Sequence, residues 1–140
     1  TSIVTPRLET LIQLSPHELR LSGEGYNLGS LRELPQITSL AIQWPSLSED
    51  ISAISSLSNL TELGLVEMEG LDLDKLSGMT QLTKLYLKFC DVTSLAPLQR
   101  LTNLRVLALQ DSNRLRSLSP IAGMKGLEFL DLTGCSEIES

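Results

Sequence analysis

The sequence is short of the residue types that most catalytic and metal sites use. It has one histidine, His17, and two cysteines, Cys90 and Cys135, among 140 residues. His17 has no serine or cysteine partner at a recognisable motif spacing, and a nucleophile–base pair needs several groups that converge in a pocket. No glycine-rich segment ends in Lys-Ser or Lys-Thr, as a phosphate-binding loop does. We therefore expect no enzyme, no catalytic or metal-binding residue and no cofactor.

Basic residues are also scarce, and long apolar segments are missing. Lysine and arginine number 11 against 17 aspartates and glutamates, so the net charge is −6. Nucleic acids and anionic membranes both favour a basic surface, and no run approaches the roughly 20 apolar residues that span a bilayer. We expect no nucleic acid, no membrane and no small-molecule substrate as a partner. The chain begins Thr1-Ser2-Ile3 without a methionine, so we expect it to be part of a longer protein. The lack of a signal peptide therefore does not indicate in which compartment that protein resides.

What the sequence does have is a regular repeat of leucine. Pairs of leucines separated by one residue, such as Leu85 and Leu87, alternate with period two, which predicts a short strand whose leucines face inward. After each pair the apolar spacing changes to three, as in Leu95, Leu98 and Leu101, and prolines stand at the matching positions 97 and 120. Both features predict 3₁₀ or irregular structure rather than a long helix. The pairs recur in steps of 21, 23, 22, 22 and 23 residues, at Leu19/Leu21, Leu40/Ile42, Leu63/Leu65, Leu85/Leu87, Leu107/Leu109 and Leu130/Leu132.

One segment carries the clearest form of the repeat. Residues 82–101 read LTKLYLKFCDVTSLAPLQRL, and the next unit, from Leu104 to Met124, repeats the pattern with one extra residue in its second half. This pattern resembles the leucine-rich repeat family, specifically its internalin-like subtype with a repeat of 22 residues. The resemblance implies an α/β fold: a right-handed superhelical solenoid with a parallel β-sheet on its concave side and 3₁₀ or irregular segments on its convex side. Stacked repeats share one continuous core.

The two ends of the repeat array look incomplete. Leu8, Leu11 and Leu14 have the spacing of a convex segment whose strand is mostly missing, and only a short tail follows the last strand. We expect residues 1–140 to form a single domain of about six repeats, cut at both ends from a longer array. Exposed apolar ends would then promote end-to-end self-association. The alternative is that residues 1–15 fold into an irregular cap.

Cys90 and Cys135 occupy the same repeat position, three residues after the second leucine. In the family this position is commonly an asparagine that turns inward and bonds backbone carbonyls. The two cysteines lie two repeats apart, or about 10 Å, and a disulfide needs Cα atoms within about 7 Å. We expect two buried free thiols with a structural role, which fits a reducing compartment. The six occupants are Glu24, Pro45, Met68, Cys90, Ser112 and Cys135.

Four of the five aromatic residues fall at positions that face outward from the predicted strands. The core does not need these rings, and exposed aromatics on a concave surface are typical of protein-binding sites. Tyr86 is flanked by Gly64 and Ala108 on neighbouring strands, which should leave its ring standing clear. The alternative is that Trp44 and Phe89 fold over the rim and pack against loops. The predicted binding residues on the concave face are Trp44, Val66, Lys84, Tyr86, Lys88, Phe89, Val106 and Phe129.

Charges of both signs lie on the same face. Glu62 and Lys84 are predicted cross-strand neighbours, and Glu67 is predicted to lie beside Lys88. Exposed pairs of this kind are worth under about 1 kcal/mol each. A protein or peptide partner with both apolar and charged groups fits this face better than a glycan or a nucleic acid.

We therefore predict a protein–protein interaction module. By resemblance it is the ligand-sensing or scaffold part of a larger STAND/NACHT-like sensor, because the segment from Leu130 to Ile138 is similar to repeats of such receptors. The alternatives are a bacterial surface or secreted internalin-like adhesin repeat, and an intramolecular structural or autoinhibitory spacer. Two unbridged cysteines favour a cytoplasmic location over an extracellular or cell-surface one.

Overall fold

Strands and 3₁₀ helices alternate along the chain. The computed structural model describes residues 16–23, 27–43 and 51–139. The strands are β1 (Glu18–Ser22), β2 (Ser39–Gln43), β3 (Glu62–Val66), β4 (Lys84–Lys88), β5 (Val106–Gln110) and β6 (Phe129–Asp131). The 3₁₀ helices are η1 (Leu28–Glu33), η2 (Ile51–Ser56), η3 (Leu73–Leu76), η4 (Ala96–Arg100) and η5 (Ser119–Ile121).

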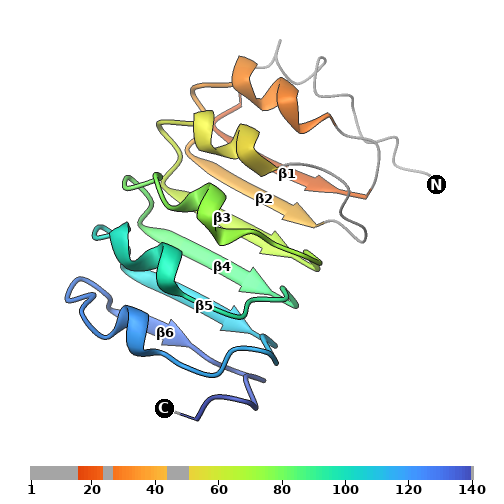
Figure 1. Ribbon diagram of the computed structural model, residues 1–140. Coiled ribbons are helices and arrows are strands. Elements are labelled where there is room, and N and C mark those ends of the chain that lie inside the picture. Colours follow the sequence, from red (N-terminus) through yellow and green to blue (C-terminus); the bar gives the residue numbers. More distant parts are fainter. Residues whose placement is uncertain (1–15, 24–26, 44–50, 140) are drawn as a thin grey trace.

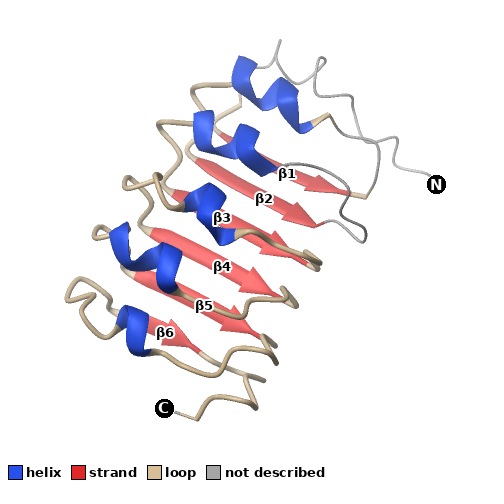
Figure 2. Ribbon diagram, viewed as in Figure 1, coloured by secondary structure: helices blue, strands red, loops and turns tan. Residues whose placement is uncertain are grey.

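The six strands form one parallel sheet in the order of the sequence, β1-β2-β3-β4-β5-β6. Each strand pairs with the next so that the leucine pairs stand in line across the sheet, with Leu63 opposite Leu85 and Leu85 opposite Leu107. The 3₁₀ helices form a second layer that covers one face of the sheet (Figures 1 and 2). This arrangement is the predicted solenoid, with 3₁₀ segments on the side away from the exposed sheet face.

The alternation of leucine and polar residues explains the strands. In β4 the two leucines are buried while Lys84, Tyr86 and Lys88 are exposed. The apolar spacing of three explains the 3₁₀ segments, because side chains three residues apart lie on one side of a three-residue turn. Pro97 and Pro120 lie in the first turns of η4 and η5, where a missing backbone N–H breaks no helical hydrogen bond.

The core is one continuous column of aliphatic side chains between the two layers. Leu63, Leu85 and Leu107 are each 0% exposed, because every repeat is covered by a neighbour on both sides. The last repeat differs: Leu130, on β6, is 37% exposed. The described part of the chain has no strand beyond β6, so the end of the core meets solvent there.

In residues 16–23, 27–43 and 51–139, a left-handed residue follows each of β1, β3, β4, β5 and β6. It stands two positions after the second leucine of the pair, where the chain leaves the sheet and turns toward the 3₁₀ layer. Glycine adopts this conformation without strain, whereas other residues adopt it at a cost of about 1–2 kcal/mol. The five residues are Gly23, Glu67, Phe89, Asp111 and Gly134, with φ of 92°, 58°, 52°, 58° and 77°.

The cysteine position makes bonds between repeats, as an asparagine would. The Cys90 thiol donates to the carbonyl of Leu65 at 3.3 Å, and the Cys135 thiol donates to the carbonyl of Leu109 at 2.6 Å. Both cysteines are free, and Cys90 is buried as predicted. The prediction that Cys135 is buried was wrong, because its repeat is the last one described and is covered on one side only. Ser112, at the same position, is fully buried, and its hydroxyl has no partner among the described residues.

A second ladder of side-chain bonds joins the turns that precede the strands. Asn59 Nδ2 donates to the carbonyl of Pro35 at 2.9 Å, and Asn103 Nδ2 donates to the carbonyl of Thr80 at 2.8 Å. Gln81, at the same position in the repeat between them, donates to a carbonyl of the preceding turn at 3.1 Å. This ladder was not predicted. The position carries an amide in four successive repeats, Gln36, Asn59, Gln81 and Asn103, and glycine in the next.

Candidate binding surface

Outward side chains of the strands line up in three rows across the sheet, which together form the sheet face. This is the face predicted to be concave. The first row is Glu18, Ser39, Glu62, Lys84, Val106 and Phe129. The middle row is Arg20, Ala41, Gly64, Tyr86, Ala108 and Asp131. The third row is Ser22, Gln43, Val66, Lys88 and Gln110.

Seven of the eight predicted binding residues lie on this face or at its rim. Lys84, Tyr86 and Lys88 are consecutive outward residues of β4, and Phe89 follows at the end of the strand. The structure therefore brings four of the predicted residues together in one repeat. Val66 and Val106 are half-buried on the neighbouring strands, and Phe129, on β6, is 55% exposed. Trp44 lies outside the described residues.

Tyr86 stands between two small residues on the neighbouring strands. Its neighbour on β3 is Gly64, where an added Cβ would lie 3.7 Å from the Ala41 Cβ and 4.0 Å from the Tyr86 Cβ. This spacing leaves a shallow hollow next to the ring. Its neighbour on β5, Ala108, faces the same way but is only 6% exposed, so larger side chains around it shield it. Gly64 and Ala108 thus flank Tyr86 as predicted, and the Tyr86 side chain is 37% exposed.

Phe89 is an exposed aromatic residue in a strained backbone conformation. Its φ is 52°, whereas the other equivalent corners in the described part of the chain carry glycine, Glu67 or Asp111. A bulky residue with positive φ is a rare outlier. The side chain is 51% exposed, so it does not pack closely against the loops, as the alternative interpretation required.

The two lysines of β4 have different environments. Lys84 Nζ lies 3.4 Å from Glu62 Oε2, which confirms the predicted cross-strand pair. Lys88 Nζ lies over the Phe89 ring, 5.3 Å from its centroid, in a cation–π arrangement. The predicted proximity of Glu67 and Lys88 holds for the backbone, where the Glu67 N–H donates to the Lys88 carbonyl at 2.9 Å. The Glu67 carboxylate instead accepts a bond from Gln43 Nε2 at 3.3 Å.

A polar network that was not predicted covers the β5–β6 side of the face. Arg105 pairs with Glu128 at 2.7 Å, and Gln110 Nε2 donates to Asp131 Oδ2 at 2.7 Å. The Thr133 hydroxyl donates to Asp131 Oδ1 at 2.6 Å. The bonds from Thr133 and then Gln110 lower the pKa of the Asp131 carboxyl, because they stabilise its charged form. In the sequence, Arg105 and Glu128, like Gln110 and Asp131, stand about one repeat apart, whereas Asp131 and Thr133 are two residues apart.

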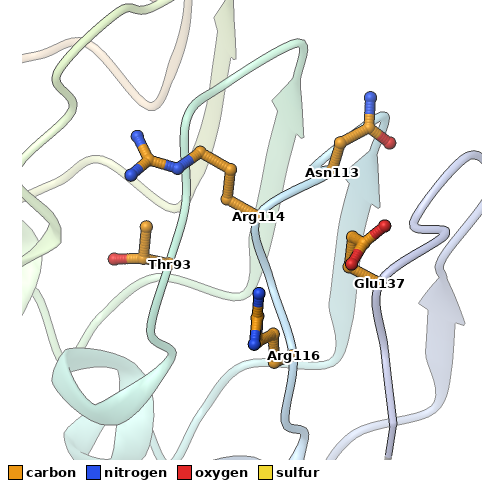
Figure 3. A pocket seen from close by; sticks show the side chains of 5 residues that line it. All are labelled: Thr93, Asn113, Arg114, Arg116 and Glu137. Atoms are coloured by element: carbon orange, nitrogen blue, oxygen red, sulfur yellow. The ribbon is translucent and has the colours of Figure 1, made fainter.

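A hollow of about 530 Å³ lies at the edge of the sheet where the strands end (Figure 3). It opens between three successive loops, and Thr93, Asn113, Arg114, Arg116 and Glu137 line it. Arg114 pairs with Asp91 at 2.8 Å, and Glu137 stands on the opposite side, so both signs of charge are present. The groups that line the hollow can hold polar or ionic ligands, but they include no nucleophile–base pair.

The described residues form neither a metal-binding cluster nor a membrane-spanning helix. Within residues 16–23, 27–43 and 51–139, no three histidine, cysteine, aspartate or glutamate side chains are grouped closely enough to hold a metal ion. No helix in these ranges has the length and apolar character to cross a bilayer. His17 is exposed, and its Nδ1 lies 3.2 Å from the Gln36 carbonyl oxygen.

Comparison with known proteins identifies the repeat. A family model described as leucine-rich repeats in two copies matches residues 80–123 and 102–140, which include strands β4 to β6. The strands, the 3₁₀ layer and the leucine register extend the same architecture back to β1. This chain carries leucine-rich repeats, which the family model matches over residues 80–140.

Two solved structures show the same fold. Internalin C2 of Listeria monocytogenes matches with a TM-score of 0.61 and 22% identity, over 74% of this chain and 55% of that one. The internalin inlF of the same organism matches with a TM-score of 0.64 and 22% identity, over 81% of this chain and 36% of that one. This chain thus spans about half or less of these internalins, and the likeness concerns the fold. No curated protein matches its sequence.

Proposed function

We propose that this chain is a protein-binding module whose sheet face recognises a polypeptide. The observation that carries the proposal is the exposed pair Tyr86 and Phe89 in one repeat, 37% and 51% exposed. The core does not use either ring, and Phe89 is held in a strained conformation. Aromatic residues dominate the binding energy of many protein interfaces.

The shape of the face suits an extended polypeptide. Six strands spaced about 4.8 Å apart make a surface about 24 Å across. The middle row contains the small residues Ala41 and Gly64 next to Tyr86, so a partner side chain can approach the backbone and pack against the ring. Lysines on either side of Tyr86 add charged contacts. The proposal involves no catalytic step, metal, cofactor, nucleic acid, membrane or small-molecule substrate.

The larger context is part of the proposal. Two free thiols support an intracellular role, as the ligand-sensing or scaffold part of a STAND/NACHT-like sensor. The fold likeness to internalins supports the alternative of a bacterial surface or secreted adhesin. A P-loop domain in the same polypeptide would favour the sensor, and a signal peptide would favour the adhesin. If the segment is an intramolecular spacer, the sheet face binds another part of its own protein.

The test is a selection of binders from a random peptide library displayed on phage, with the purified chain as the target. Gly64→Val places a side chain in the hollow beside Tyr86 on a strand that accepts a β-branched residue. We expect selected peptides to lose most of their affinity for Gly64→Val and Tyr86→Ala. Gly78→Val is the matched control, because Gly78 lies in the turn after η3 with nothing within 4 Å of its added Cβ. A failure to select binders, or binders unaffected by Gly64→Val and Tyr86→Ala, would refute the proposal.

A further inference from the structure

We propose that the polypeptide recognised by the sheet face carries a carboxylate next to an apolar side chain. In this arrangement the carboxylate binds Lys88, and the apolar side chain packs on Tyr86 and Phe89. This inference rests on the proposed function and adds the chemistry of the partner. It comes from the charges around β4, which differ from those in the neighbouring repeats.

Lys88 is a cation without a carboxylate partner in the described part of the chain. Lys84, on the same strand, pairs with Glu62 at 3.4 Å, and Arg105 on the next repeat pairs with Glu128 at 2.7 Å. Glu67 and Asp111 follow the register partners of Lys88 on β3 and β5. Neither forms an ion pair with Lys88 among the described residues, and Glu67 accepts a bond from Gln43 instead. The charge of Lys88 is therefore available to a ligand.

The Lys88 ammonium also lies next to an aromatic ring. It is 5.3 Å from the centroid of the Phe89 ring, and a cation–π contact of this kind is attractive. A carboxylate that binds the ammonium then lies beside the exposed ring. The strained corner at Phe89, with φ of 52°, keeps the ring at the end of β4 rather than in the core.

The spacing along β4 fits two side chains of one extended peptide. Tyr86 and Lys88 are alternate residues of the strand, so they project from the same face about 7 Å apart. Alternate side chains of an extended peptide have the same spacing. A segment that runs along β4 can therefore place an aliphatic or aromatic residue on Tyr86 and an aspartate or glutamate on Lys88. A basic residue at the second position would be repelled.

Peptides selected from the random library on the wild-type chain test this inference. We expect them to be enriched in aspartate or glutamate two positions from an apolar residue. Lys88→Gln should weaken the acidic peptides about fivefold, the upper range for an exposed ion pair. A fresh selection on Lys88→Glu should replace the acidic residue by lysine or arginine. Lys75→Glu is the matched control, because Lys75 lies on η3 in the 3₁₀ layer, away from the sheet face.

The results separate this inference from the proposed function. The inference is overturned, and the proposed function stands, if the peptides depend on Tyr86 and Gly64 but show no acidic preference. The same holds if peptides selected on Lys88→Glu keep the acidic preference. Peptides that are insensitive to Tyr86→Ala and Gly64→Val, or no selected peptides at all, overturn both. Lys75→Gln changes the net charge as much as Lys88→Gln does, so equal weakening by these two variants would assign the acidic preference to net charge and also overturn the inference.

Discussion

Replacing Gly126 with asparagine should extend the ladder of amide side chains by one bond. Asn59 and Asn103 each donate to a carbonyl of the preceding turn, and Gly126 stands at their position in the next repeat. A Cβ on Gly126 would lie 3.4 Å from the Thr102 carbonyl oxygen, which is ordinary contact. Its backbone is not left-handed, so another residue fits. The amide of Gly126→Asn should reach Thr102 as Asn103 reaches Thr80.

The expected gain has two parts that a control variant separates. Replacing glycine with alanine at a compatible position raises the free energy of unfolding by about 0.4–1 kcal/mol, because the unfolded chain loses freedom. An added side-chain hydrogen bond contributes about 0.5–1.5 kcal/mol. Because this site is exposed, we expect the lower half of that range. Gly126→Ala should therefore stabilise the chain by about 0.4–1 kcal/mol, and Gly126→Asn by about 0.5–1 kcal/mol more.

Equilibrium unfolding in urea, followed by circular dichroism, measures both variants. Comparable slopes for all proteins would show that the midpoints report stability and not a change in cooperativity. Asn103→Ala provides the reverse test, because it removes an existing bond and should destabilise by about 0.5–1.5 kcal/mol. If Gly126→Asn is no more stable than Gly126→Ala while Asn103→Ala is destabilised, the ladder does not extend to the last repeat.

Four further outcomes are expected. Leu85→Ala should lower the free energy of unfolding in urea by about 2–5 kcal/mol, because Leu85 is 0% exposed. Tyr86→Ala should change the free energy of unfolding by no more than about 0.5 kcal/mol. A large loss for Tyr86→Ala would mean that the ring holds the fold together. Phe89→Asn should leave the free energy of unfolding unchanged or higher, because asparagine tolerates a φ of 52°. The same variant should weaken the binding of the selected peptides. Reduced stability would show that Phe89 is structural. A bulky thiol reagent should modify Cys135 before Cys90 in the native chain, because burial raises the pKa of the Cys90 thiol; mass spectrometry showing the reverse order would contradict the burial described. Sedimentation at rising concentration should show self-association through the exposed end of the core at β6, and a strictly monomeric chain would argue against it.

Most of the fold could be predicted because a solenoid is built from local units. The period of two around Leu85 and Leu87 sets which side chains face inward, and the 22-residue steps place those leucines in line across the sheet. Each repeat contacts mainly its neighbours in the sequence. Local patterns therefore determine the strands, the 3₁₀ segments and their order without knowledge of distant contacts.

The contacts within the candidate site were harder to predict. The positions of Lys84, Tyr86, Lys88 and Phe89 follow from the alternation along β4. The partner of Glu67 does not, because this residue lies in the left-handed corner after β3, where the side chain leaves the register of the sheet. Sequence spacing describes neighbours within the sheet but not the direction of a side chain beyond a turn.

By itself, the sequence determined the repeat, the inward leucines and the outward aromatic and charged residues, since all of these depend on backbone period. Only the tertiary structure decided how much of each side chain solvent reaches. Ala108 and Tyr86 share a row, yet one is 6% and the other 37% exposed, and Cys135 is less buried than Cys90 at the same repeat position. Exposure depends on the size of the neighbouring side chains and on whether a further repeat covers the residue, and a repeating pattern records neither.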